Sequence, residues 1–206
     1  GPWSQALGPT HFSWMFLDET PKGLPRVTLP DVWFVYRTNP AISFWDTPGI
    51  GAKMARFPFI VAFAYTRDES NHFADILLPA TTQLEQIDVH SSYGHLYALA
   101  NNKAIEPLGE ALPNTEVFRR LAAAMGFTEP CFRDTDEEIA QMAWRHDDPK
   151  AQGLDWNTLR QSGWQRLQVP AAYAPFAHGN FPTASGKCEF SSATLDAQGL
   201  DAVPQY

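Results

Sequence analysis

Hydrophobic residues in the first half of the chain fall into three short runs, and each run predicts a β-strand. The run DVWFVYR at residues 31–37 is followed by Asn39-Pro40, and the residue before a proline disfavours helical backbone. The runs at residues 58–64 and 74–78 are apolar at consecutive positions, as expected of strands that are covered on both faces. We therefore expect the three runs to form one parallel sheet in which the last two strands are fully buried.

Capping residues and the spacing of apolar positions predict helices around these strands. Three helices are predicted after the strands: 115–125 between Asn114 as N-cap and Gly126, 137–146 after the capping box of Thr135 and Glu138, and 155–162 between Asp155 and Gly163. Together with a helical segment at 48–56, this order predicts an α/β fold with a Rossmann-like, mostly parallel sheet flanked by helices. Ligands bind beyond the carboxyl ends of such strands, so the loops after residues 37 and 64 are the candidate site.

The two ends of the chain do not hold a helical or strand period. Residues 1–30 are rich in proline and aromatic residues, and we expect an irregular N-terminal arm that lies over another surface. An irregular C-terminal extension is expected after the last helix.

Composition and charge exclude some classes of partner. The 206 residues are 44% hydrophobic, which is enough for the core of one large domain or two small ones. With 15 basic and 23 acidic residues the net charge is −8, which opposes binding to nucleic acid. No apolar run approaches the roughly 20 residues that cross a bilayer. We expect a soluble chain from either the cytoplasm or the periplasm.

The cysteines and histidines give no metal site. Cys131 and Cys188 are far apart and form no C-x-x-C motif, so neither an iron–sulfur cluster nor a thiolate zinc site is expected from this chain. Both are expected to be small buried hydrophobic residues. His90 and His95 enclose four residues, but no third ligand of fixed geometry accompanies them. We therefore predict no metal site among the cysteines and histidines.

Gly49-Ile50-Gly51 begins like a dinucleotide-binding turn, but Met54 stands where the third glycine would be. A glycine turn that leads into a helix is the favoured interpretation. Nucleophile-elbow, zinc-protease and P-loop motifs are absent from the sequence. The hypothesis of a nicotinamide-dependent dehydrogenase depends on these glycines alone. A self-contained hydrolase or kinase is disfavoured.

The loop between the second and third predicted strands carries a polar cluster that includes Asp68, Glu69, Ser70 and Asn71. A solvated turn would need fewer polar residues. Asp75 joins the third strand directly, where a buried carboxylate must be hydrogen-bonded or it costs several kcal/mol. We expect Asp75 to hold its own loop in place.

From this loop onward the sequence resembles the molybdopterin oxidoreductases of the dimethyl sulfoxide reductase family. Residues 69–80, followed by Glu85, are similar to that family's ETAKYADVVLPA motif and the acidic residue after it. The stretch YGHLYALANNKAIEPLGEALPNTEVFRRLAAAMGF and the segment FPTASGKCEFSS follow family motifs in the same order. The resemblance covers residues 31–206.

The resemblance implies a fragment of a catalytic subunit that helps to bind one molybdopterin guanine dinucleotide, with Mo or W in the parent enzyme. It implies an iron–sulfur cluster in an amino-terminal part absent from this chain, no cofactor bound to the isolated fragment, and no turnover by it. The expected partners are the other domains of the parent, an electron-transfer subunit and a small-molecule substrate. The implied domains are an arm at 1–30, an α/β molybdopterin oxidoreductase domain at 31–128, a helical connector at 129–182 and the start of a C-terminal dinucleotide-binding domain at 183–206.

Carried over residue by residue, the resemblance implies a cofactor site at the carboxyl edge of the sheet. Its predicted residues are Asn39, Phe63, Ala64, Glu69, Asp75, Gln86 and Asn114. Ala64 stands where many members have Asp, Gln86 replaces a frequent Lys, and Asn114 replaces an Asp. Guanine presents N1–H and an amino group, which carboxylates accept, so the loss at Ala64 removes an acceptor. A non-catalytic α/β binding or scaffold module that has lost the cofactor is the alternative.

Overall fold

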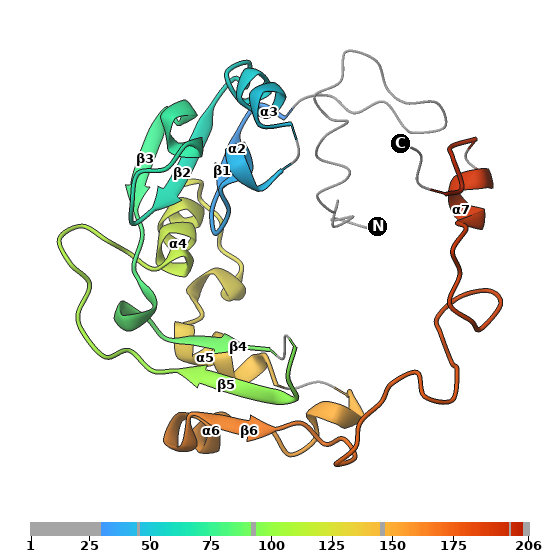
Figure 1. Ribbon diagram of the computed structural model, residues 1–206. Helices are drawn as coiled ribbons and strands as arrows, with labels where there is room; N and C mark the ends of the chain where they lie inside the picture. Colours follow the sequence, from blue (N-terminus) through green and yellow to red (C-terminus); the bar gives the residue numbers. More distant parts are fainter. Residues whose placement is uncertain (1–29, 45, 92–93, 145–146, 198, 204–206) are drawn as a thin grey trace.

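The computed structural model describes residues 30–44, 46–91, 94–144, 147–197 and 199–203. These residues form a mixed α/β fold with two three-stranded sheets and helices packed against them (Figure 1). The predicted N-terminal arm lies almost wholly at residues 1–29, outside the described residues. The sheets hold separate cores, so each is described in turn.

The first sheet is parallel, with strand order β1-β2-β3, as predicted. Its strands are β1 (Trp33–Val35), β2 (Ile60–Ala64) and β3 (Ile76–Pro79). Trp33 aligns with Ile60, and Val61 aligns with Ile76. The pairing is parallel because each connection returns the chain to the opposite edge before the next strand begins.

Helices make the first connection, and a 3-10 turn makes the second. These elements are α2 (Pro40–Ser43), α3 (Thr47–Met54) and η1 (Ser70–Phe73). The Asp46 carboxylate accepts a hydrogen bond from Gly49 N and starts α3. A Cβ at residue 49 would lie 1.9 Å from Oδ2 of Asp46, which explains the glycine. The Gly49-Ile50-Gly51 motif therefore lies inside α3, whereas it was expected to form a turn before the helix.

Helices cover both faces of this sheet. Val35, Ile50, Met54, Ile60 and Ala62 form a core with α2 and α3 on one face. On the other face the rings of Phe34, Phe63 and Phe118 pack together, and Phe118 comes from α4 (Asn114–Ala124).

The prediction that both later runs are fully buried is right for residues 60–63, in β2, and wrong for Pro58 and Phe59 before them and for β3. Ile76 is 44% exposed and Leu77 41% exposed. The physical reason is that β3 lies at an edge of the sheet, and none of its residues belongs to the core that α2 and α3 form with β1 and β2. Beyond the bridge between Ala80 and Leu112, no described strand pairs with its outer side.

The second sheet is antiparallel and was not predicted. Its strands are β4 (Asp88–His90), β5 (Tyr97–Asn101) and β6 (Trp164–Arg166), in the order β4-β5-β6. The helices α5 (Asp136–Met142) and α6 (Trp156–Ser162) supply the core residues that pack with it. Ala98, Ala140, Trp156 and Leu159 form this core.

Several predicted helix ends are confirmed, and two are wrong. The helix α5 ends at Met142, short of its predicted end at residue 146. Thr135 and Glu138 form the expected capping box, and Gly163 ends α6 with a φ of 80°. Asn114 is the first residue of α4 and not its N-cap. Pro113 takes the cap position, because its carbonyl accepts from the backbone N–H groups of Glu116 and Val117 at 3.0 and 3.2 Å.

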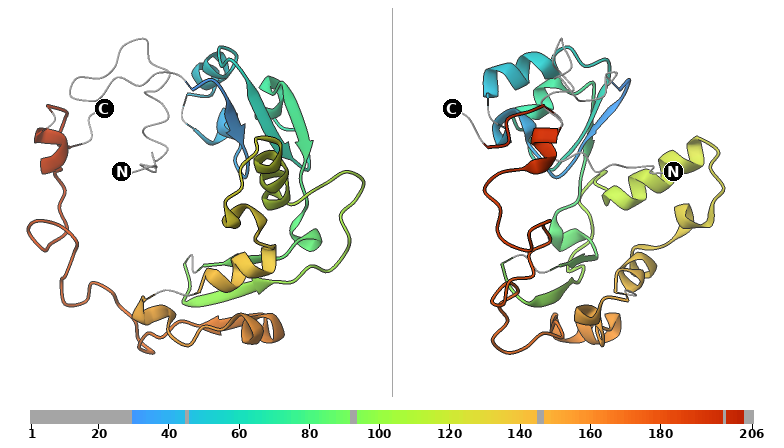
Figure 2. Two further views of the ribbon diagram at one scale, coloured as in Figure 1. Left: turned by 180° about the vertical axis from the view of Figure 1, so that it is seen from behind. Right: turned by 90° about the vertical axis from the view of Figure 1, so that its right-hand side faces the viewer.

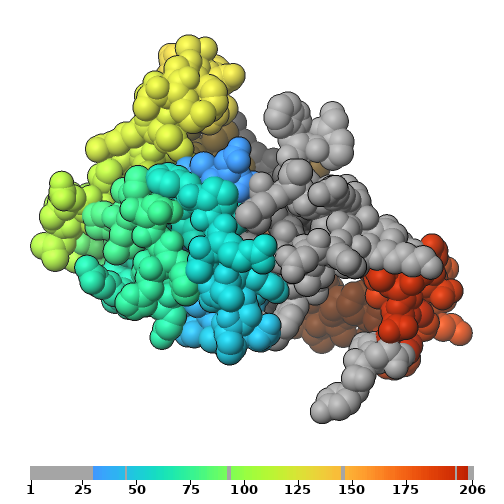
Figure 3. All heavy atoms as spheres, turned by 90° about the horizontal axis from the view of Figure 1, so that it is seen from above, coloured from blue at the N-terminus to red at the C-terminus, as the bar shows by residue number. Residues whose placement is uncertain are grey.

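The C-terminal residues extend away from the first sheet. They contain α7 (Ala193–Ala197), which lies apart from the sheet in Figures 2 and 3. Cys131 and Cys188 are both exposed free thiols, so the prediction that they are buried is wrong. Cys131 lies in the 3-10 turn Pro130–Arg133 and Cys188 in the extension, and neither segment belongs to the two cores.

Candidate functional site

The carboxyl ends of β1, β2 and β3 lie at one edge of the parallel sheet. The parallel bridge between Ala80 and Leu112 brings the segment that leads into α4 to the same edge. Loops after each strand therefore meet there, as is usual for ligand sites in parallel α/β sheets. We call this region the carboxyl edge.

The first part of the carboxyl edge is a hydrogen-bonded cluster of Asn39, Glu69 and Ser70. Asn39 Nδ2 donates to Oε2 of Glu69 at 2.8 Å, and the Ser70 hydroxyl donates to Oδ1 of Asn39 at 2.6 Å. The same hydroxyl oxygen accepts from the backbone N–H of Ala41 at 3.0 Å. Ser70 is only 1% exposed. These bonds join the loop after β1 to the loop after β2.

Glu69 is the exposed carboxylate of this cluster. The Asn39 amide, which donates to Glu69, holds the pKa of that carboxyl below its ordinary value, so the group is ionised at neutral pH. In the same loop, Oδ1 of Asp68 accepts from the backbone N–H of Asn71 at 2.9 Å. The polar loop predicted from the sequence is thus ordered by its own side chains.

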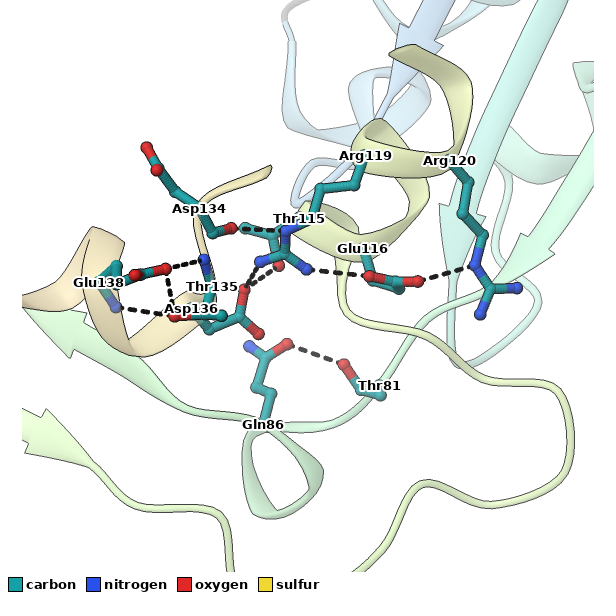
Figure 4. A network of polar contacts seen from close by, with 10 residues as sticks. All are labelled: Thr81, Gln86, Thr115, Glu116, Arg119, Arg120, Asp134, Thr135, Asp136 and Glu138. Atoms are coloured by element: carbon teal, nitrogen blue, oxygen red, sulfur yellow. Dashed lines mark hydrogen bonds and ion pairs between the residues drawn. The ribbon is translucent and has the colours of Figure 1, made fainter. Parts of the chain in front are cut away.

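The second part of the carboxyl edge follows β3. The Thr81 hydroxyl donates to Oε1 of Gln86 at 2.8 Å (Figure 4). Asn101 Nδ2 donates to the carbonyls of Gln83 at 2.6 Å and Gln86 at 2.9 Å. Gln86 is therefore held by its side chain and by its backbone.

Glu85, beside Gln86, has a structural role that the sequence analysis missed. Its Oε2 accepts from the backbone N–H and hydroxyl of Thr82, and its Oε1 accepts from Leu108 N at 2.8 Å. These donors lower the pKa of the Glu85 carboxyl, with the backbone N–H of Thr82 the largest cause. The signal was present, because Thr82-x-x-Glu85 is a capping-box sequence.

Asn114 lies at the carboxyl edge, at the start of α4. An ion network ties this helix to Asp134 and to the first residue of α5. Arg119 donates to the Asp134 carbonyl at 2.7 Å and to Glu116 at 3.0 Å, and it pairs with Asp136 (Figure 4). The Thr115 hydroxyl also donates to Asp136, at 2.6 Å. The network fixes where the first turn of α4 lies.

The remaining predicted site residues do not all place their side chains at the carboxyl edge. Phe63 is buried, and its ring stacks on Phe118 with centroids 5.6 Å apart, so its side chain belongs to the core. Ala64 ends β2 at the carboxyl edge. Asp75 lies at the opposite, amino edge, where its Oδ2 accepts from Ile60 N at 2.7 Å. Asp75 is exposed and holds the start of β2, whereas it was expected to be buried and to hold its own loop.

Metal ligands do not gather in the described part of the chain. No group of three or more His, Cys, Asp or Glu side chains there could hold a metal ion. Among the same residues, no helix combines the length and the apolarity that a membrane span requires.

Comparison with known proteins identifies the family of this chain. The family model for molybdopterin oxidoreductases matches residues 20–124, and the chain belongs to this family. The chain is 35% identical over 175 residues to a probable oxidoreductase of Bacillus subtilis, YoaE, covering 84% of this chain and 25% of that protein. It is 27% identical to the dimethyl sulfoxide/trimethylamine N-oxide reductase of Rhodobacter capsulatus, covering 78% of this chain and 19% of that protein.

A solved structure shares the fold. Acetylene hydratase from Pelobacter acetylenicus superposes with a TM-score of 0.64 at 21% identity, over 96% of this chain and 26% of that one. The chain thus spans about a quarter of the length of the proteins that it matches first.

Proposed function

We propose that this chain is part of the catalytic subunit of a molybdopterin-dependent oxidoreductase, and that its carboxyl edge binds the guanosine end of one molybdopterin guanine dinucleotide. The observation that carries the proposal is the cluster of Asn39, Glu69 and Ser70, which joins two loops at this edge. In such an enzyme the bound cofactor supplies two-electron chemistry at Mo or W. The residues of this chain would bind and orient its nucleotide end.

The donors and acceptors at the carboxyl edge suit a guanosine. Glu69 offers an ionised acceptor for N–H groups, and Gln86 and Asn114 offer amides for ribose or base atoms. Metal coordination, the iron–sulfur cluster, the small-molecule substrate and the electron-transfer subunit are assigned in this proposal to other parts of the enzyme.

Nucleotide titration of the 206-residue chain tests the proposal. GDP should bind with a dissociation constant in the millimolar range, worth about 4 kcal/mol, because the other domains that would close the site are missing. Amide shifts in NMR spectra should be confined to the loops after residues 37 and 64 and should be larger for GDP than for ADP. The proposal fails if neither nucleotide causes shifts at several millimolar, or if both cause the same shifts.

A second candidate function is a non-catalytic binding or scaffold module that has lost the cofactor. Ala64 favours it, because a methyl group stands at the end of β2 where many family members carry an acceptor. Equal or absent responses to GDP and ADP in the same titration would favour this candidate.

A further inference from the structure

The end of β2 offers no side-chain acceptor, but a carboxylate returns to the same edge five residues later. Ala64 ends the strand, and Glu69 lies in the loop that follows it. Asn39, from the loop after β1, holds this carboxylate at 2.8 Å. Glu69 is therefore fixed between the carboxyl ends of two adjacent strands.

We infer that Glu69, oriented by Asn39, supplies the carboxylate that recognises the guanine base in place of the acid missing at residue 64. The inference rests on the proposed function, since it assigns one contact within that site. Guanine presents N1–H and an exocyclic amine along one edge, and a carboxylate can accept from both. Adenine presents a ring-nitrogen acceptor at the corresponding position, which a carboxylate repels. Glu69 would then favour guanine over adenine.

The bonding of Asn39 indicates a positioning role for that residue. Its Nδ2 donates to Glu69 and its Oδ1 accepts from the Ser70 hydroxyl, so both ends of the amide are occupied. Ser70 is itself buried and bonded to Ala41 N. Glu69 is thus held by a chain of hydrogen bonds that leads to Ala41, a buried core residue of α2. Such preorganisation reduces the entropy that is lost when a ligand binds.

Charge alone predicts the opposite effect of removing this carboxylate. GDP and ADP both carry negative phosphates, so replacing Glu69 with a neutral residue should strengthen the binding of both if the carboxylate acts only through repulsion. A selective weakening of GDP binding therefore reports a contact with the base.

The experiment compares Glu69→Gln with Glu129→Gln in the 206-residue chain, by titration with GDP and with ADP. Glu129 is exposed and lies after α4, outside the segments that form the carboxyl edge, so it is a matched control. Glu69→Gln should weaken GDP binding about tenfold or more and leave ADP binding no weaker, while Glu129→Gln should behave as the unaltered chain does. Unchanged amide spectra away from the loop would show that each variant folds.

A double variant tests the positioning role of Asn39. If Asn39 acts through Glu69, the Asn39→Ala/Glu69→Gln chain should bind GDP as weakly as Glu69→Gln alone, and not more weakly. Retained GDP preference in Glu69→Gln would overturn the inference and leave the proposed function standing. Equal weakening of both nucleotides would also overturn it. Absence of any GDP response in the unaltered chain would overturn the proposed function and, with it, the inference.

Discussion

Single residues in this chain differ widely in what they contribute, and burial is the main reason. Leu159, in α6, is fully buried in the core beside the antiparallel sheet, whereas Leu108 is 84% exposed. The same Leu→Ala change at the two positions therefore separates the effect of lost packing on stability from the effect of losing a leucine anywhere in the chain.

Leu159→Ala is expected to lower the free energy of unfolding by about 3 kcal/mol, because it removes buried methyl groups and leaves a cavity. Leu108→Ala should change it by less than about 0.5 kcal/mol. Urea denaturation followed by circular dichroism measures both. Similar losses in the two variants would contradict the assigned core.

Glu85 gives a pH-dependent prediction at the residue scale. Its pKa is lowered in the folded chain from the usual 4.5, so the stability it adds is present above that pH and is lost as the pH falls through its folded pKa. Glu85→Gln should therefore lower the melting temperature at pH 7, and the gap to the unaltered chain should narrow below pH 4.5. Glu110→Gln is the control and should show no such gap. A gap that widens in acid would contradict the prediction.

At the scale of elements, the features that local sequence determines were the ones that could be predicted. The parallel strands follow from apolar runs, and the start of α5 follows from Thr135 and Glu138, two residues that interact within one turn. The antiparallel sheet could not be found in this way. Its strand β6 has three residues and pairs with β5, where Leu99 aligns with Trp164. A local pattern of apolar residues does not show which distant segment a strand pairs with, and many residues separate β5 from β6.

The candidate site was predictable to a similar extent. The sequence placed Asn39 and Glu69 in loops at one edge, and the structure joins them by a hydrogen bond. It did not reveal Ser70 as the buried partner of Asn39. The contribution of Asp75 at the opposite edge was also hidden, because the strand to which it bonds depends on the sheet pairing.

The Arg119 network makes a prediction about the contact between elements. Arg119 is 21% exposed and joins α4 to Asp134 and to the start of α5, whereas Arg120 is 65% exposed and pairs with Glu116 of its own helix. Arg119→Met should cost about 2 kcal/mol of stability, because partly buried carboxylates lose their partner. Arg120→Met should cost less than about 0.5 kcal/mol. Thermal unfolding of the two variants measures the difference, and equal costs would refute it.

At the scale of the whole molecule, the chain contains two separate cores. One includes Met54 and Ile60 beside the parallel sheet, and the other includes Ala98 and Leu159 beside the antiparallel sheet. Two cores without shared residues can open independently.

Native-state hydrogen exchange should therefore respond locally to core changes. Met54→Ala is expected to speed the exchange of the β2 amides at least tenfold or so while leaving β5 amides nearly unchanged. Leu159→Ala should produce the reverse pattern. Mass spectrometry of peptides from each sheet measures this, and uniform acceleration in either variant would show instead that the two sheets unfold together.

The exposed edge of β3 affects how this chain can self-associate in solution. A strand edge without a neighbour presents N–H and C=O groups that can hydrogen-bond to another chain. In β3 the last residue is Pro79, which has no N–H, and its carbonyl already accepts from Leu112 N at 3.2 Å. The carboxyl end of β3 therefore cannot pair with a strand of another copy. Self-association through β3 is restricted to the first residues of the strand.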